Sequence, residues 1–332
     1  MKRTLLTDHC GVSTWAVLVA AGLFFSSLGS SWPAVVAAAD SLDDKLSQVS
    51  GAYAEAYISP LVHGTGANLN SGLYTNAHIG KSQLTFEIGL KFAGTYMSEN
   101  DKTFSRYQTV TLDEDLGFDP GDPLYGEEAV LEFIGPTVLG DTDTDGEANL
   151  YVDGILVRSE PTISGVVDTR WVPLIIPEGS VGGIAGFKVT LRWLPSVSLG
   201  DLGKVKFFGF GLQYSVNNLI QTLPIDVVVG YFRQDLDIGK SLDTDASSFF
   251  LGLSRTSSAL TVYGGGALES SKMKIDYTWV SPHGNIPVSF ETDGVQEGRL
   301  TIGAMVDVGL RIYAEANAGK LAAYSAGLMF GF

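Results

Sequence analysis

The strongest constraint on the fold of this chain is a two-residue alternation of apolar and polar side chains. In the segment 84–92 every even-numbered residue is apolar, and the odd-numbered residues between them include Glu87 and Lys91. A period of two predicts a β-strand, because successive side chains of a strand point to opposite faces. The segments 187–193 and 208–217 repeat the pattern, so we expect a fold built from strands.

Further segments of this kind bring the expected number of strands to ten, and short extra strands in the middle of the chain would raise it to about twelve. Strands of this length, separated by turn residues, are typical of transmembrane barrels, in which closure of the sheet satisfies every backbone donor and acceptor. The additional candidates are residues 68–79, 225–237, 246–257, 259–280, 285–308, 310–318 and 321–332.

A soluble β-sandwich also alternates, but three features favour a membrane barrel. Lys, Arg and Glu lie on the minority face, Tyr and Trp recur near strand ends, and the last strand ends in an aromatic residue. That strand resembles the signal that the barrel-assembly machinery reads in outer-membrane proteins. We predict an all-β transmembrane antiparallel β-barrel over residues 61–332, with an N-terminal helix and a large acidic insert. The expected assembly signal consists of Tyr324, Leu328, Phe330 and Phe332.

Residues 1–39 have the features of a secretory signal peptide. Lys2 and Arg3 precede an apolar run, and small residues at 37–39 suit a cleavage site. A retained anchor is the alternative, although the apolar run is short for a membrane span. The single cysteine, Cys10, lies in this segment, so the mature chain holds no disulfide and no thiolate metal site. We expect the outer membrane of a Gram-negative bacterium, with its lipid, lipopolysaccharide and barrel-assembly machinery as partners.

The region 40–60 has a helical period, with Leu42, Leu46, Val49 and Tyr53 at spacings of three and four residues. The proline at position 60 is expected to end this amphipathic helix. The helix could plug the barrel or form a cap beneath it, and the sequence leaves both alternatives open.

The alternation breaks in residues 98–182, which we expect to form one long insert. Residues 99–147 hold fourteen acidic side chains against two basic ones. So long a segment within a barrel is usually a plug, a constriction or an external loop. Counting hairpins back from the last strand places both ends of the insert on the periplasmic side. The net charge of the chain, −16, repels nucleic-acid phosphate and excludes that class of partner.

Within the insert, alternate carboxylates precede a glycine, as in DxDxDG calcium loops. A structural calcium ion and a solvated acidic turn are both compatible with this motif, and no other cofactor is expected. The EF-hand version would carry Glu where Val152 stands. The candidate calcium ligands are Asp141, Asp143, Asp145, Glu147 and Asn149.

Charged residues on the minority face should point into the lumen, where they would either set the selectivity of a channel or pair and fill a narrow barrel. The favoured hypothesis is passive transport of small or hydrophobic solutes through a restricted lumen. The alternative is a structural or adhesive barrel that binds divalent cations through its insert. Enzymatic activity is not expected, because none of the histidines at 63, 78 and 283 accompanies an evident nucleophile. The expected lumen-facing charges are Glu87, Lys91, Lys188, Arg192, Asp226, Asp307 and Glu315.

Several short motifs resemble an uncharacterised bacterial outer-membrane family of the DUF6588 type. They are the stretches 57–61, 69–77, 136–140, 191–195, 209–215, 314–317 and 326–330. The resemblance implies a location and a fold but no substrate. In architecture, an N-terminal plug with a barrel is also loosely similar to outer-membrane transporters of the long-chain-fatty-acid type.

Overall fold

The computed structural model describes residues 42–43, 45–198, 204–281 and 284–331. The predicted signal peptide and Phe332 of the predicted assembly signal lie outside the described residues. Among the described residues, no helix combines the length and the apolarity needed to cross a bilayer.

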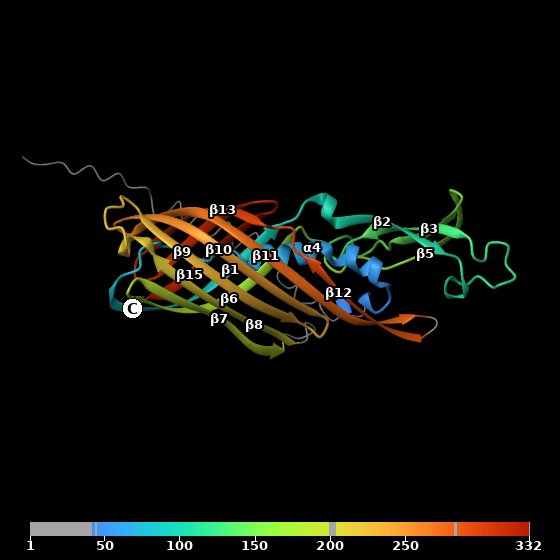
Figure 1. Ribbon diagram of the computed structural model, residues 1–332, viewed down its shortest axis with the longest axis horizontal. Coiled ribbons are helices and arrows are strands. Elements are labelled where there is room, and N and C mark those ends of the chain that lie inside the picture. Colours follow the sequence, from blue (N-terminus) through green and yellow to red (C-terminus); the bar gives the residue numbers. More distant parts are fainter. Residues whose placement is uncertain (1–41, 44, 199–203, 282–283, 332) are drawn as a thin grey trace, which may run out of the picture.

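Ten antiparallel strands of the described chain form a closed barrel (Figure 1). Their order is β10-β9-β8-β7-β6-β1-β15-β14-β13-β11, and pairing of β11 with β10 closes the ring. The predicted fold class is thus confirmed. The barrel strands are β1 (Ser82–Tyr96), β6 (Trp171–Ile184), β7 (Phe187–Ser198), β8 (Lys204–Ser215), β9 (Asp226–Ile238), β10 (Leu242–Ser257), β11 (Leu260–Ser281), β13 (Gly298–Asp307), β14 (Arg311–Ala318) and β15 (Ala322–Gly331).

The alternation in the sequence separates the two faces of this barrel. On β1 the side chain of Ile88 is 65% exposed, whereas Lys91, on the opposite face of the same strand, is 3% exposed and lies inside. The same contrast holds between Leu191 and Arg192 on β7. Exposed apolar side chains on the outer face of a closed sheet are the arrangement that a bilayer requires.

One strand predicted from the sequence does not exist and another was missed, so the predicted total of ten barrel strands is still correct. Residues 68–79 are not a strand: they continue helix α4 (Gly51–Leu69) as an irregular segment whose side chains are mostly buried. The missed strand is β6, which occupies the end of the expected insert. Pro173 and Pro177 interrupt its pattern, since proline removes a ladder donor and usually argues against a strand.

In the expected helical region 40–60, residues 42–43 and 45–46 are helical, and a turn at 47–49 separates them from helix α4. Helix α4 begins at Gly51 and continues past Pro60 to Leu69. A proline inside a helix costs roughly 3 kcal/mol. Packing on almost every side outweighs this cost, because Tyr57 and Ile58 are fully buried next to the proline.

The insert therefore comprises residues 97–170, and it lies at the end of the barrel opposite to the end of β15 (Figure 1). We call these two ends the insert mouth and the C-terminal mouth. Because β6 was missed, hairpin counting had placed the insert at the end of the barrel where β15 terminates; the structure places it at the opposite end. The insert folds as a four-stranded sheet of β2 (Thr103–Thr111), β3 (Glu128–Pro136), β4 (Glu147–Val152) and β5 (Ile155–Pro161).

The expected long strand 285–308 is divided into β12 (Gly284–Asp293) and β13. The first part of β11 pairs with β13 in the barrel, and its second part pairs with β12 beyond it. The hairpin of β12 with the second part of β11 therefore projects beyond the ring of barrel strands. Short one-turn helices lie at Glu99–Lys102, Glu114–Leu116 and Val216–Asn218.

Substitution of Leu191 by Arg tests the lipid-facing surface. Leu191 is 49% exposed near the middle of β7, and a cation at such a position costs about 2–4 kcal/mol of unfolding free energy. Ile155 is 70% exposed on the insert sheet, so Ile155→Arg should change stability by less than about 0.5 kcal/mol. Urea unfolding from lipid vesicles measures both, and equal effects would contradict a lipid-facing position for Leu191.

Candidate functional site

The lumen is filled by the chain segment that precedes β1. At the insert mouth, Leu42 and Leu46 pack in one cluster with Leu242 and Ile275. At the C-terminal mouth, the backbone N–H of Gly186 donates to the Gly80 carbonyl over 3.2 Å. Residues 51–80, which we call the luminal segment, thus run through the barrel from one mouth to the other before β1 begins (Figure 1).

The carboxyl end of helix α4 is capped by charged and polar side chains of the barrel wall. The last carbonyls of a helix have no partner within the helix and carry partial negative charge. Arg192 of β7 donates to the Leu69 carbonyl over 3.2 Å, and Gln234 of β9 donates to the same oxygen over 2.6 Å. From the opposite wall, Arg299 of β13 donates to the Ala67 carbonyl over 2.6 Å.

Gly72 is held from both sides immediately after this helix end. Its N–H donates to Glu315 over 2.8 Å, and its carbonyl accepts from Arg192 over 2.6 Å and also from Lys91. Its φ of +62° is a conformation that L-residues other than glycine seldom adopt. A Cβ here would lie 3.1 Å from the Tyr313 hydroxyl and 3.3 Å from the Lys91 side chain.

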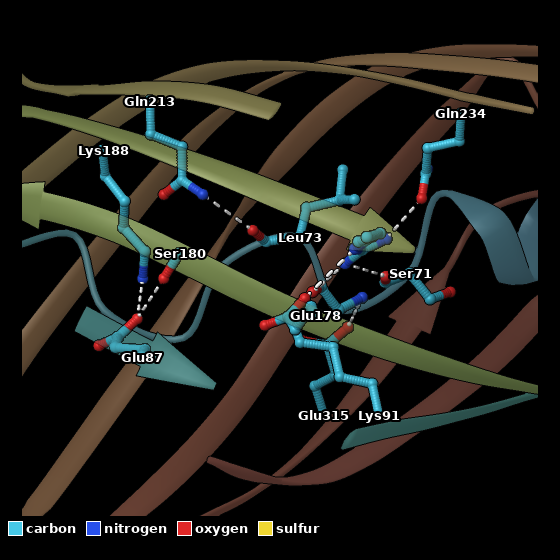
Figure 2. A network of polar contacts seen from close by, with 12 residues as sticks. Ser71, Leu73, Glu87, Lys91, Glu178, Ser180, Lys188, Gln213, Gln234 and Glu315 are labelled. Atoms are coloured by element: carbon cyan, nitrogen blue, oxygen red, sulfur yellow. Dashed lines mark hydrogen bonds and ion pairs between the residues drawn. The ribbon is translucent and has the colours of Figure 1, made fainter. Parts of the chain in front are cut away.

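The buried cations of the wall are each balanced by a buried carboxylate. Glu178 accepts from Lys91 at 2.9 Å and from Arg192 at 3.2 Å, and Figure 2 shows Glu178 and Lys91 converging next to Ser71. Arg299 is paired in the same way with Glu269 at 3.1 Å. Pairing of this kind is what permits charges in a region without bulk water.

Aromatic stacking holds the next stretch of the luminal segment. Tyr74 lies parallel to Phe250 of β10 with ring centroids 5.0 Å apart, and edge-on to Tyr263 at 5.6 Å. Further along, the Ala77 N–H donates to the Ser254 hydroxyl over 2.9 Å. The segment is therefore bound to the wall over its whole length.

Two cavities border the luminal segment, one inside the barrel and one at the C-terminal mouth. A cavity of about 10 Å³ remains beside Tyr74 and Arg299, which is enough for about one water molecule. At the C-terminal mouth the barrel opens into a polar vestibule of about 480 Å³. Its charged lining includes Glu87, which pairs with both Lys188 and Arg311.

The structure gathers the seven predicted lumen-facing charges into two groups. Lys91, Arg192 and Glu315 contact the luminal segment directly. The others lie around the vestibule, where Asp307 pairs with Arg311 at 2.9 Å and Asp226 with His78 at 3.2 Å. This second group consists of Glu87, Lys188, Asp226 and Asp307.

Several wall residues that bind the segment were missed in the sequence. Arg299 precedes the outward-facing Leu300 in an alternating strand, so the period-two pattern could have identified it. Gln234 lies between Arg233 and Asp235, so no apolar alternation marks it in the sequence. Glu178 could not be found in this way, because it lies on the proline-interrupted strand β6.

The predicted calcium ligands do not converge on one point. Within the described chain, no group of three or more His, Cys, Asp or Glu side chains is arranged to hold a metal ion. Asp141 instead closes its own turn, accepting from the Asp143 N–H at 2.8 Å and the Thr144 hydroxyl at 3.0 Å, and these bonds lower the pKa of its carboxyl group. Glu147 and Asn149 lie on β4. Calcium binding by this loop stays a prediction.

Comparison with protein families matches residues 14–332 to DUF6588, which is described as a family of unknown function. The chain belongs to this family. No curated protein matches the sequence at a significant level. The family assignment therefore brings no activity with it.

Solved structures similar to this chain are outer-membrane barrels. They include the outer-membrane protease OmpT of Escherichia coli, with 12% identity over 77% of this chain and 98% of that one and a TM-score of 0.29. OmpT of Vibrio cholerae lacking loop L8 has 12% identity over 75% and 99%, with a TM-score of 0.25. The translocator domain of the autotransporter NalP of Neisseria meningitidis has 9% identity over 81% and 93%, with a TM-score of 0.29. Similarity this low carries no argument about activity.

Substitution of Gly72 by Ala tests how closely the barrel wall packs around the luminal segment. A positive φ costs an L-residue about 1–2 kcal/mol, and crowding in a packed core adds about 1–3 kcal/mol. Gly309 has a φ of +93° in the turn between β13 and β14 but open space around it, so Gly309→Ala isolates the backbone strain. Urea unfolding of both variants from lipid vesicles should show the larger loss for Gly72→Ala. Equal losses would contradict tight enclosure of Gly72.

Proposed function

We propose that this outer-membrane barrel is sealed at rest and serves as an anchor that presents its acidic β-sheet domain, β2–β5, on the cell surface. The observation that carries the proposal is the filled lumen, in which residues 64–80 bind the wall along their length and the cavity beside Tyr74 and Arg299 measures about 10 Å³. A structural or adhesive role needs no open pore and no catalysis. It also explains why so much of the chain lies outside the barrel.

The energetics argue against passive transport through this lumen. Seven hydrogen bonds join a charged wall residue to the luminal segment: three from Arg192, two from Arg299, one from Lys91 and one to Glu315. At about 1.5–3 kcal/mol each, they oppose displacement by roughly 10–20 kcal/mol if they add. Even the lower figure leaves about one molecule in 10⁷ open at equilibrium.

The lengths of the connections support an orientation with the insert outside the cell. Barrels of this class have short periplasmic turns and longer extracellular loops. The C-terminal mouth carries the connections 185–186, 216–225, 258–259 and 308–310. The insert mouth carries the whole of 97–170 together with the projecting hairpin of β11 and β12. We therefore assign the insert mouth to the extracellular side.

The presented domain has a shallow groove with an acidic and aromatic lining. Glu128, Glu132 and Asp153 line it together with Tyr107 and Tyr151, over a volume of about 660 Å³. No basic residue is among those that line it. Carboxylates beside exposed aromatic faces favour a positively charged partner, because both attract cations.

Conductance measurements test the sealed barrel. Refolded protein in a planar bilayer should show no stepwise current, and the double substitution Arg192→Ala with Arg299→Ala, which removes five of the seven bonds, should produce intermittent openings. Arg233 is a matched control, since it is exposed and pairs with Asp245 away from the lumen. Steady channels from the unaltered protein would refute the sealed state.

Spermine, a small polycation, probes the groove. Calorimetric titration should show binding that weakens with salt. Glu132→Gln and Tyr107→Ala should each lower the affinity about threefold to tenfold, the range expected for one carboxylate or one cation–π contact. Asp143→Ala, in the predicted calcium loop of the same domain, serves as the control and should leave spermine binding unchanged. A parallel calcium titration of that variant tests the calcium prediction.

A further inference from the structure

The luminal segment and β1 form a hairpin whose apex lies at the C-terminal mouth. The apex is fixed by the wall, because the Ala185 N–H donates to the Lys81 carbonyl over 2.9 Å and the Gly186 N–H donates to the Gly80 carbonyl over 3.2 Å. From this apex β1 runs back along the wall to the insert mouth, while the segment before it runs back through the lumen to the same mouth. Residue 42 and residue 331 therefore lie at opposite ends of the barrel.

The two halves of helix α4 differ in composition: the second half suits the narrow lumen, and the first half suits packing against the insert. Its second half is made of small residues where it meets the wall: a Cβ on Gly64 would lie 2.5 Å from Val172, and one on Gly66 would overlap Ser271. Its first half is bulky and aromatic. Tyr53 packs edge-on against Phe133 of the insert at 5.3 Å, outside the ring of barrel strands.

The first half of the helix is also the part on which the insert is fastened. The Val138 N–H of the insert donates to the Tyr57 carbonyl over 3.0 Å, and the Tyr57 hydroxyl donates to the Ser164 carbonyl over 3.0 Å. Lys45 donates to the same Ser164 carbonyl at 2.8 Å. The segment 42–60 and the acidic domain thus form one packed unit at the insert mouth.

We propose that the barrel carries its own N-terminal segment across the outer membrane, so that residues 42–60 reach the cell surface through the lumen that residues 64–80 then seal. The inference rests on the orientation given under the proposed function. A secreted chain reaches the outer membrane from the periplasm, and this segment ends on the other side. The path through the lumen connects the two, and the aromatic half of α4 docked on the insert holds the segment in place.

Four single-cysteine variants test the proposal in the full-length protein. Gln48, Thr142, His78 and Ala259 are all exposed; the first two lie at the insert mouth and the last two at the C-terminal mouth. A membrane-impermeant maleimide applied to intact cells should label Gln48→Cys and Thr142→Cys. It should label His78→Cys and Ala259→Cys only after the outer membrane is permeabilised. The unaltered protein serves as the background control for Cys10.

The outcomes separate this proposal from the orientation on which it rests. Labelling of Thr142→Cys but not Gln48→Cys on intact cells would overturn the passage of the N-terminal segment and leave the orientation standing. Labelling of His78→Cys and Ala259→Cys alone would overturn the orientation, and with it the surface location of residues 42–60. An epitope inserted before Leu42 gives a second readout, since antibody should bind it on intact cells as strongly as an epitope at Thr142.

Discussion

The structure depends on hydrogen bonds between two sets of polar groups: the backbone carbonyls at the end of helix α4 and the cationic side chains on the inner face of the barrel. Neither set could be buried without the other. A helix that ends inside a barrel has carbonyls without partners, and a narrow barrel that carries arginines on its inner face has guanidinium groups without water. Here each set satisfies the other. Arg192 is fully buried, yet its donors reach the carbonyls of Leu69 and Gly72 and the carboxylate of Glu178. Without the carbonyls, uncompensated charge would remain in the interior; without the cations, backbone carbonyls there would lack hydrogen-bond donors.

This constraint also explains why the barrel interior is so polar and yet so full. A water-filled pore of this strand number could hydrate its charges without any protein partner. In this barrel the cations point at backbone oxygens of the luminal segment, a geometry that depends on the path of the main chain more than on the side chains that it carries. The sequence of the segment is then free to meet a different requirement, the lack of space, which the glycines at 64, 66 and 72 satisfy.

The sequence predicted the wall well because each barrel strand has one face in lipid and one face inside, which is the condition for a period of two. It failed where that condition is absent. Most side chains of residues 68–79 are buried within the barrel, so their apolar residues carry no information about a face. The strand β6 contains prolines and glycines that imitate a loop. Inward charges such as Lys91 could be read from the alternation, whereas their targets, main-chain carbonyls of a distant segment, leave no trace in the sequence.

The position of the luminal segment constrains how the barrel can assemble. Its contacts come from β7, β9, β10, β13 and β14 on all sides of the ring, and its next residues form β1, which pairs with both β6 and β15. A closed ring with an empty lumen would expose Arg192, Arg299 and Lys91 without acceptors. Closure around the segment satisfies these cations while the last strand pairs, so the segment and the strands stabilise one another only when they come together. The luminal segment is in this sense part of the barrel's core.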